Sequence, residues 1–104
     1  MQECKSIKPV DNNGKPHGDW ESYHSNGQLW YKGNYNHGEP HGYWEVYRPD
    51  GKLWYKGSYI HGANHGDWEG YRPDGQLWYK GNYNMGKRIG LWCINDKFIF
   101  YAQM

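Results

Sequence analysis

The sequence predicts an all-β protein, an elongated single-layer antiparallel sheet of stacked β-hairpin repeats. Two observations support this prediction. A Gly-x-Trp-Glu segment recurs every 24 residues, beginning at Gly18, Gly42 and Gly66, and a degenerate copy begins at Gly90. No segment shows the apolar period of an amphipathic helix. A fixed period of this size is typical of repeat proteins, in which one small unit stacks on the next.

The composition indicates how so thin a structure is held together. The chain has 104 residues, enough for one domain, with 7 Trp and 11 Tyr, whereas Leu, Ile, Val and Phe are scarce. Each aromatic ring buries a large area, so a few rings per repeat can replace an aliphatic core. The 15 glycines recur at fixed offsets, which indicates turns rather than a flexible linker.

Residues 18–41 illustrate the repeating unit. We predict a strand at 20–24, a turn at 25–27 and a second strand at 29–35, because the latter is rich in residues that favour a pleated surface. A glycine-rich loop at 37–42 leads to the next hairpin. The single domain therefore divides into an N-terminal cap of about residues 4–17, three repeats at 18–41, 42–65 and 66–89, and a C-terminal cap hairpin at 90–104. In the N-terminal cap, Ile7 takes the place of Tyr31 and Gly14 that of Gly38.

The turns decide which face each first strand presents. The Arg-Pro-Asp-Gly segments at 48–51 and 72–75 predict a type I turn with a glycine bulge, which places Tyr47 opposite Leu53. In the first repeat, Asn26-Gly27 fits a two-residue type I′ turn equally well, with Trp20 opposite Gly33 and Glu21 opposite Lys32. The two turns differ by one residue in register, so the facing of Trp20 and Tyr23 stays open.

The second strands have a clearer pattern. Leu29, Tyr31, Gly33 and Tyr35 alternate onto one face, and the same pattern returns at 53–59 and 77–83. We expect this face to be inward, with a neighbouring aromatic ring lying over the glycine backbone. The opposite face is expected to carry Trp30, Trp54 and Trp78 together with Lys32, Lys56 and Lys80.

Residues 31–42, with the sequence Tyr-Lys-Gly-Asn-Tyr-Asn-His-Gly-Glu-Pro-His-Gly, resemble the MORN repeat pattern. Residues 55–66 and 79–90 read the same way, the latter with Met85 and Ile89 in place of histidines. The segment that begins at Trp20 and ends at Leu29 is similar to the MORN-variant repeat of bacteria and phages. The resemblance covers about residues 10–92.

The resemblance implies elongated antiparallel sheets that serve as interaction modules, with roles in protein assembly, phospholipid binding and dimerisation. Some bacterial relatives are antitoxins of a toxin–antitoxin pair. No catalytic residue belongs to the repeat, so none is transferred to this chain.

The tryptophan row on the second strands is the best candidate for a binding surface. Aromatic rings beside cations are typical of protein-binding hot spots, although the same rings could instead close the thin sheet. The predicted partner-binding residues are Trp30, Trp54, Trp78, Lys32, Lys56, Lys80, Tyr23, Tyr47 and Tyr71. We expect a non-catalytic module that binds a protein partner, antitoxin-like or inhibitory. The alternatives are a protein that binds a nucleotide or sugar between aromatic rungs and a phospholipid-binding module at a membrane surface.

Enzymes and cofactor-dependent proteins fit the sequence poorly. Carboxylates and lysines recur in every repeat, whereas an active site needs one converging set, and the chain has no nucleophile elbow, P-loop or Cys-x-x-Cys motif. The pairs His37/His41 and His61/His65 lie in glycine-rich segments, so we expect no metal or cofactor. We expect His17, His41 and His65 to dock the loops by hydrogen bonds instead.

The net charge of the chain indicates which partners to expect, and its cysteines indicate the cellular compartment. A net charge of +1 gives no electrostatic reason to expect nucleic acid or an anionic membrane as a partner. The N-terminal residues lack the apolar run of a signal peptide, and Cys4 and Cys93 lie at opposite ends of the chain. We therefore expect free thiols and a cytoplasmic protein. The apolar run at 98–101 predicts an exposed sheet edge, through which a homodimer could form.

Overall fold

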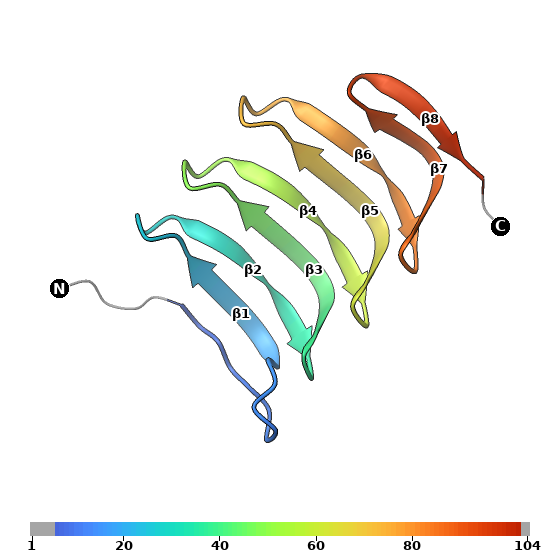
Figure 1. Ribbon diagram of the computed structural model, residues 1–104. Helices are drawn as coiled ribbons and strands as arrows, with labels where there is room; N and C mark the ends of the chain where they lie inside the picture. The colour runs from blue at the N-terminus through green and yellow to red at the C-terminus, as the bar shows by residue number, and fades with distance from the viewer. Residues whose placement is uncertain (1–5, 103–104) are drawn as a thin grey trace.

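The computed structural model describes residues 6–102, which form one antiparallel sheet of eight strands in chain order (Figure 1). The strands are β1 (Gly18–Tyr23), β2 (Leu29–Asn36), β3 (Glu39–Tyr47), β4 (Leu53–Ile60), β5 (Ala63–Tyr71), β6 (Leu77–Asn84), β7 (Lys87–Ile94) and β8 (Lys97–Tyr101). The Cα positions extend over 49 × 34 × 12 Å, and the short dimension is that of a single layer. The predicted fold class is confirmed.

Three-residue turns connect β1 to β2, β3 to β4 and β5 to β6 along one edge of the sheet (Figure 1). In the second repeat, Arg48 N–H donates to Lys52 O at 2.9 Å and Gly51 N–H donates to Arg48 O at 2.9 Å. Gly51 has a φ of 89°, as the predicted type I turn with a glycine bulge requires. His24 makes the same two bonds in the first repeat and Asn26 does not adopt a positive φ, so the type I′ alternative is wrong there.

Each second strand contains a further bulge at its tryptophan. Tyr47 lies opposite Leu53, as predicted, but Val46 lies opposite Tyr55, which leaves Trp54 as an extra residue. The first hairpin has the same bulge, at Trp30. Both registers considered for that hairpin therefore occur in it. On the turn side of the bulge Tyr23 lies opposite Leu29, and on the other side Trp20 lies opposite Gly33 and Glu21 opposite Lys32.

This bulge corrects the predicted facing of Leu29 and Trp30. Tyr31 lies on the inward face, as predicted, but Leu29 pairs with Tyr23 on the outer face. The centres of the Trp30 and Tyr31 rings are 5.4 Å apart, and the two rings line a hollow on the inward face. Trp54 and Trp78 occupy the same bulge position in their hairpins. Alternation fails here because a bulge sets two residues against one and exchanges the faces beyond it.

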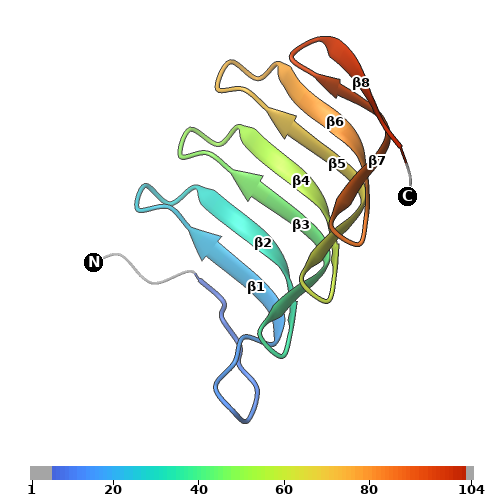
Figure 2. The ribbon, with the colours of Figure 1, turned by 45° about the vertical axis from the view of Figure 1, so that its right-hand side comes forward.

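Two-residue turns connect successive hairpins along the opposite edge of the sheet. His37 and Gly38 have φ values of 46° and 92°, the pattern of a type I′ turn, and β3 begins directly after them at Glu39. The expected glycine-rich loop at 37–42 is therefore a tight turn followed by strand. Between β2 and β3, Lys32 pairs with Glu45 but Asn34 pairs with His41, so the strand register shifts between these two pairs. Gly42 lies within this shift and has a φ of 79°. The strands curve strongly in this half of the sheet (Figure 2).

Residues 6–17 lie against the free edge of β1. Ile7 and Glu21 exchange two backbone hydrogen bonds of 2.9 Å, and Val10 forms an isolated bridge with Pro16. Ile7 therefore lies beside β1, but as a single bridge and not within a strand. Its partner Glu21 is the equivalent of Glu45, which pairs with Lys32, so Ile7 takes the position of Lys32 and the predicted place of Tyr31 is wrong. Gly14 is at a turn, as expected, although this turn resembles the three-residue type rather than that of Gly38. The prediction for Cys4 lies outside the described residues.

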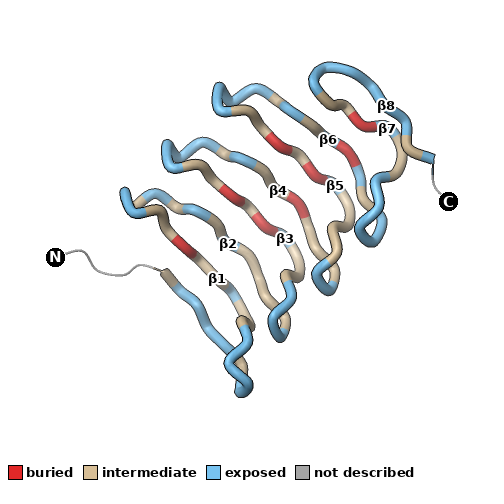
Figure 3. The backbone as a smooth tube through the Cα atoms, viewed as in Figure 1, coloured by how far each residue is buried: buried red, intermediate tan, exposed pale blue. Residues whose placement is uncertain are grey.

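The core is a row of tryptophans, each lying over a glycine of the neighbouring strand. Trp44, Trp68 and Trp92 are only 6%, 3% and 0% exposed. The Trp44 ring covers Gly33 so closely that a Cβ there would lie 2.1 Å from the ring, and equivalent contacts join Gly57 to Trp68 and Gly81 to Trp92. Buried positions form a band across the middle of the sheet, between two exposed edges of turns (Figure 3). The predicted packing of an aromatic ring over the glycine backbone is confirmed.

The first hairpin follows the same plan, which settles the two facings left open. Trp20 lies opposite Gly33 and contacts Tyr35 edge-on at 5.0 Å, so it faces inward. Its indole N–H donates to Pro9 O at 2.7 Å, which links the N-terminal segment to the core row. Tyr23 faces outward, where its hydroxyl donates to Glu21 Oε1 at 3.1 Å.

Candidate protein-binding face

Three tryptophans on the inward face remain partly exposed. Trp30, Trp54 and Trp78, which we call the Trp ladder, are 42%, 37% and 39% exposed, and each occupies the bulge after a three-residue turn. The core tryptophans at 20, 44, 68 and 92 donate their indole N–H groups to backbone carbonyls. Among residues 6–102, the indole N–H groups of the Trp ladder have no such acceptor. The ladder therefore presents both ring surface and free donors.

A basic residue precedes the three-residue turn in each repeat, and in the first two repeats its side chain lies against the ladder tryptophan. The His24 ring stacks on Trp30 at 5.2 Å, and the Arg48 guanidinium carbon lies 4.6 Å from the centre of the Trp54 ring. Arg48 Nη2 also donates to Tyr71 O at 3.0 Å, and Arg72 Nη2 donates to Asn95 Oδ1 at 2.7 Å. His24 Nε2 lies 2.9 Å from Tyr47 O, so each of the three side chains joins its turn to the next hairpin, and Arg48 also keeps a positive charge over a ladder ring.

Two hollows lie on the inward face near the Trp ladder, one lined by Trp30 itself and the other by Tyr55 and Tyr79, whose rings contact Trp54 and Trp78. One, of about 350 Å³, is lined by Trp30, Tyr31, Tyr35, Pro40, Trp44, Val46, Tyr55 and Tyr59. The other, of about 330 Å³, is lined by Tyr55, Tyr59, Asn64, Trp68, Tyr79, Tyr83 and Arg88. Tyr55 and Tyr59 line both, so the two hollows are neighbours on the inward face, and we describe them together. We call them the aromatic trough.

Burial raises the pKa of several tyrosines of the aromatic trough. Burial raises the pKa of Tyr59 to about 12, with smaller contributions from the neighbouring tyrosines. Burial also raises the pKa of Tyr55 and Tyr79. These phenols stay protonated, so no ionised tyrosine adds negative charge to the trough.

The outer face carries the remaining predicted contact residues, and there the lysines and tyrosines contact glutamates. The lysine Nζ atoms of Lys56 and Lys80 lie 3.2 and 3.5 Å from Glu69 carboxylate oxygens, and that of Lys32 lies 3.5 Å from Glu45. Tyr71 donates its hydroxyl to Glu69 at 2.9 Å. Burial opposes ionisation of Glu69, but hydrogen bonds from Tyr71 and Lys56 outweigh it and lower its pKa. The predicted cross-strand charge pairing is present, and such exposed pairs each contribute about 0.2–1 kcal/mol to the free energy of unfolding.

The nine predicted contact residues therefore do not form one surface. The three tryptophans lie on the inward face, whereas the lysines at 32, 56 and 80 and the tyrosines at 23, 47 and 71 lie on the outer face. The bulge at each ladder tryptophan causes this separation. Sequence reasoning also missed the positions of His24, Arg48 and Arg72, although a basic residue directly before each turn was a readable signal.

Histidine side chains next to the two-residue turns connect successive hairpins by accepting backbone N–H groups of those turns. His17 Nδ1 accepts the backbone N–H of His37 at 3.1 Å, His41 Nδ1 that of His61 at 3.3 Å, and His65 Nδ1 that of Met85 at 3.1 Å. The predicted docking role is confirmed for all three acceptor histidines. Within the part of the chain that the structure describes, no three His, Cys, Asp or Glu side chains gather in a way that could hold a metal ion.

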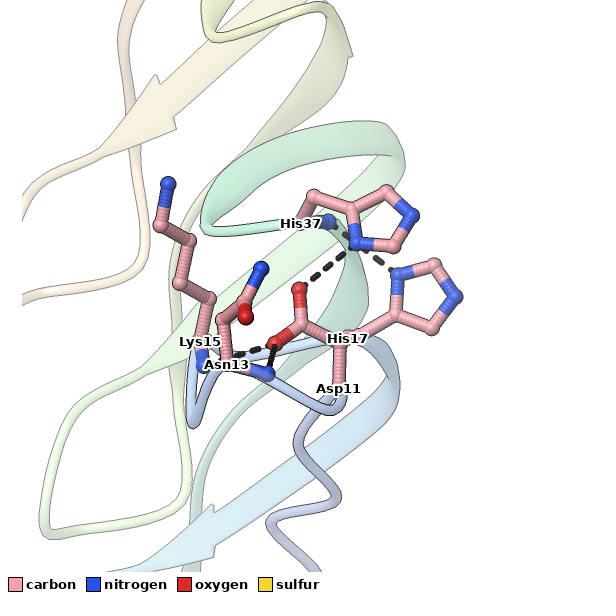
Figure 4. Close-up of polar contacts among 5 residues, drawn as sticks. All are labelled: Asp11, Asn13, Lys15, His17 and His37. Carbon is pink, nitrogen blue, oxygen red and sulfur yellow. Dashed lines mark hydrogen bonds and ion pairs between the residues drawn. The ribbon is translucent and has the colours of Figure 1, made fainter.

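Asp11 anchors the N-terminal turn to this same edge (Figure 4). Its Oδ2 lies 2.6 Å from His37 Nδ1, and its Oδ1 accepts the backbone N–H groups of Asn13 and Lys15. The hydrogen bond with His37, followed by that from Lys15, lowers the pKa of Asp11 to about 2. The carboxylate form is therefore part of the folded arrangement at neutral pH.

The family model of the MORN repeat variant matches residues 16–37, 40–61 and 64–85. These three matches cover more than half of the chain and recur with its 24-residue period. The chain belongs to the MORN repeat variant family. Repeats of this family typically serve as non-catalytic modules that bind proteins or membrane lipid. A comparison with curated proteins gives no match.

The last hairpin of this MORN-variant chain differs from the repeats before it. Leu91, Phe98 and Phe100 are 60%, 73% and 72% exposed, and cross-strand pairing of Leu91 with Phe100 and of Cys93 with Phe98 places them on the outer face. Strand β8 pairs only with β7 among the described residues. The predicted apolar edge is thus present. The described residues form no helix that is long and apolar enough to cross a membrane.

Proposed function

We propose that this MORN-variant protein binds a protein partner through the Trp ladder and the aromatic trough. The exposed ladder is the observation that supports the proposal. Three rings of 37–42% exposure stand in equivalent positions, two of them beside a stacked basic side chain. Tryptophan and arginine are the residues most enriched where protein interfaces gain their binding energy.

The shape and charge of the face favour a macromolecule over a small ligand. Equivalent positions of successive hairpins are about 9.6 Å apart, because each hairpin adds two strands spaced at about 4.8 Å. The ladder alone therefore spans about 19 Å, the scale of a protein interface. A single layer bounds each hollow from one side only, which suits an extended partner better than a sequestered nucleotide or sugar. The net charge of +1 gives an anionic membrane little attraction.

The antitoxin-like or inhibitory role is the finer form of this proposal. A module without catalytic groups acts on its partner by covering part of the partner's surface. In this form, the covered surface is the active site of a bacterial or phage enzyme in the cytoplasm. Co-expression tests it, because the protein should relieve the growth defect caused by the partner and the Trp54→Ala variant should not.

Affinity capture with chemical cross-linking tests the proposal itself. The wild-type protein should retain a partner that the Trp54→Ala variant loses, while the melting temperature of the variant falls only slightly. Tyr43→Ala, which removes an exposed ring opposite Ser58 on the outer face, is the matched control and should retain the partner. If Trp54→Ala greatly lowers the melting temperature but still captures the partner, the ladder has a structural role and not a binding role.

The apolar outer face of the last hairpin favours a separate proposal, self-association through β8. Three side chains of 60–73% exposure lie together beside a strand edge that is open among the described residues. Open edges of this kind pair readily with another strand. Light scattering at increasing concentration should show dimers, and a single mass near 12.4 kDa at high concentration would contradict the proposal.

A further inference from the structure

We infer that the segment bound by the Trp ladder and aromatic trough is acidic and proline-rich, lies in the polyproline II conformation and runs across the strands. The inference rests on the proposed function and specifies the chemistry of the partner. Three independent properties of the face point to this occupant, namely its spacing, its hydrogen-bonding groups and its charge.

The spacing of the ladder matches the period of polyproline II. Successive ladder tryptophans are separated by two strands, or about 9.6 Å. A polyproline II helix repeats every three residues, or about 9.3 Å. Over the two steps from Trp30 to Trp78 the mismatch grows to only about 0.6 Å. An α-helix repeats every ~5.4 Å and a β-strand presents one face every ~6.6 Å, so neither follows the ladder.

The hydrogen-bonding groups of the face are complementary to a proline-rich backbone. The ladder offers indole N–H groups, and the trough offers protonated tyrosine hydroxyls, whereas neither hollow is lined by an Asp or Glu. Proline lacks a backbone N–H, and the carbonyls of polyproline II have no internal partner. Such a chain presents acceptors to a surface of donors. A sugar presents hydroxyl donors as well, and a β-strand presents N–H groups. For these donors the hollows offer only neutral acceptors, the tyrosine hydroxyls and the Asn64 amide, and no carboxylate.

The charge of the face selects acidic residues in the bound segment. His24, Arg48 and Arg72 follow the ladder along the turn edge, and the Arg88 guanidinium carbon lies 5.0 Å from the Trp92 ring centre in the trough region. The strand carboxylates Glu45 and Glu69 lie on the outer face, paired with lysines. Asp50 and Asp74 are at the turn tips, where their carboxylates accept backbone N–H groups of their own turns. A carboxylate at every third position of the segment would therefore meet one basic side chain per hairpin.

Synthetic peptides test this inference directly. The probe is a fluorescein-labelled peptide of four Glu-Pro-Pro units, and fluorescence anisotropy measures its affinity for the full chain. Four Glu-Gly-Gly units keep the charge without the polyproline II conformation, and four Lys-Pro-Pro units keep the conformation with the opposite charge. We expect the Glu-Pro-Pro peptide to bind at least about tenfold more tightly than either control. Equal affinity for the Glu-Gly-Gly peptide would overturn the inference.

Variants of the protein test whether the peptide binds at the Trp ladder. Trp54→Ala should weaken Glu-Pro-Pro binding about tenfold or more, and Tyr43→Ala, which removes an exposed ring opposite Ser58 on the outer face, should leave it unchanged. Trp54→Phe keeps a ring but removes the indole N–H, and Arg48→Gln removes one charge. Both variants should weaken binding of the peptide severalfold, while circular dichroism shows that the sheet is folded. They therefore test the inference even if Trp54→Ala does not fold. Unchanged binding in both milder variants would overturn the inference.

The remaining outcomes separate this inference from the proposed function. If a captured partner depends on Trp54 but the Glu-Pro-Pro peptide neither binds nor competes with it, the polyproline II inference is wrong and the protein-binding proposal stands. If neither a partner nor the peptide depends on Trp54, both are wrong. Binding to phosphatidylserine vesicles without binding to the peptide would assign the face to a lipid surface and would also overturn the inference.

Discussion

At the residue scale, close approach rather than backbone conformation explains the glycines beneath the core tryptophans. The φ of Gly57 lies outside the left-handed region, yet an added Cβ would lie 2.1 Å from Cδ2 and 2.2 Å from Cε2 of Trp68. The ring is fixed from both sides, because its N–H donates to Ser58 O at 3.0 Å and Tyr59 packs edge-on at 5.0 Å. A side chain at this glycine therefore forces the core row apart.

We predict that Gly57→Ala lowers the free energy of unfolding by about 1–3 kcal/mol or more, the usual cost of overpacking a fixed core. Thermal and urea unfolding followed by circular dichroism measure the change. Ser58→Ala, the next residue on the outer face, should change stability by less than about 0.5 kcal/mol. A Gly57→Ala protein as stable as the wild type would show that Trp68 does not lie over this glycine.

The carboxyl of Asp11 should titrate far below its ordinary range. Its hydrogen bond with His37 lowers the pKa from 3.8 to about 2 in the folded protein. A lowered folded-state pKa stabilises the fold above the unfolded value, so this contribution is complete above about pH 4 and disappears as the pH falls through 2. Carbon-detected NMR of the carboxyl should give a midpoint near 2, and His37→Ala should raise it. A wild-type midpoint of 3.8 would contradict the contact.

At the element scale, the two edges of the sheet hold successive hairpins together in different ways. Basic side chains connect the three-residue turns, as Arg48 does through Tyr71 O. Histidine side chains connect the two-residue turns, as His41 does by accepting the N–H of His61 at 3.3 Å. The backbone bond from Gly62 N–H to Pro40 O, at 2.9 Å, adds to this second edge. Register between hairpins is thus set at both ends of each strand.

We predict that His41→Ala lowers the free energy of unfolding by about 0.5–1.5 kcal/mol, the net worth of one hydrogen bond. His41→Asn keeps an acceptor near the same place and should recover part of the loss. Urea unfolding measures both, and hydrogen exchange at the amide of His61 should accelerate in His41→Ala alone. An unchanged exchange rate would show that this amide does not depend on His41.

The hairpins were predictable from the sequence, but the face of the Trp ladder was not. Arg48-Pro49-Asp50-Gly51 specifies its turn chemically, and an alternating strand follows it, so the turn type and the pair of Tyr47 with Leu53 could be derived. The bulge at Trp54 contains no glycine and leaves no local signal, so simple alternation placed the ring on the wrong face. The pair Gly38 and Gly42 looked like a loop because one glycine makes the turn and the other bends the next strand.

At the scale of the whole molecule, stability is close to a sum over equivalent hairpins. Among the described residues each strand pairs only with its neighbours in the chain, and the Trp-over-Gly contact recurs with the 24-residue period. The two ends differ, since residues 6–17 cover the edge of β1 while β8 is open among the described residues. Repeat proteins of this kind gain stability with each added unit and tolerate the loss of a whole unit.

Deletion of residues 42–65 should therefore leave a folded, shorter sheet. The cut removes one full period, so His41 is joined to Gly66, which occupies the position of Gly42 in the next copy. We predict a retained β-sheet circular dichroism spectrum and a lower melting temperature. Deletion of residues 42–53, half a period, places turn residues against strand residues and should abolish cooperative unfolding. Equal stability of the two deletions would contradict the repeat architecture.

The distinction between the buried tryptophan row and the exposed Trp ladder is the claim on which the account depends. Hydroxyl-radical footprinting with mass spectrometry measures the reaction rate of each indole in the free protein. Trp30, Trp54 and Trp78 should react several times faster than Trp44, Trp68 and Trp92, which are 6% exposed or less. Equal rates for the two rows, or faster reaction of the core row, would contradict the account.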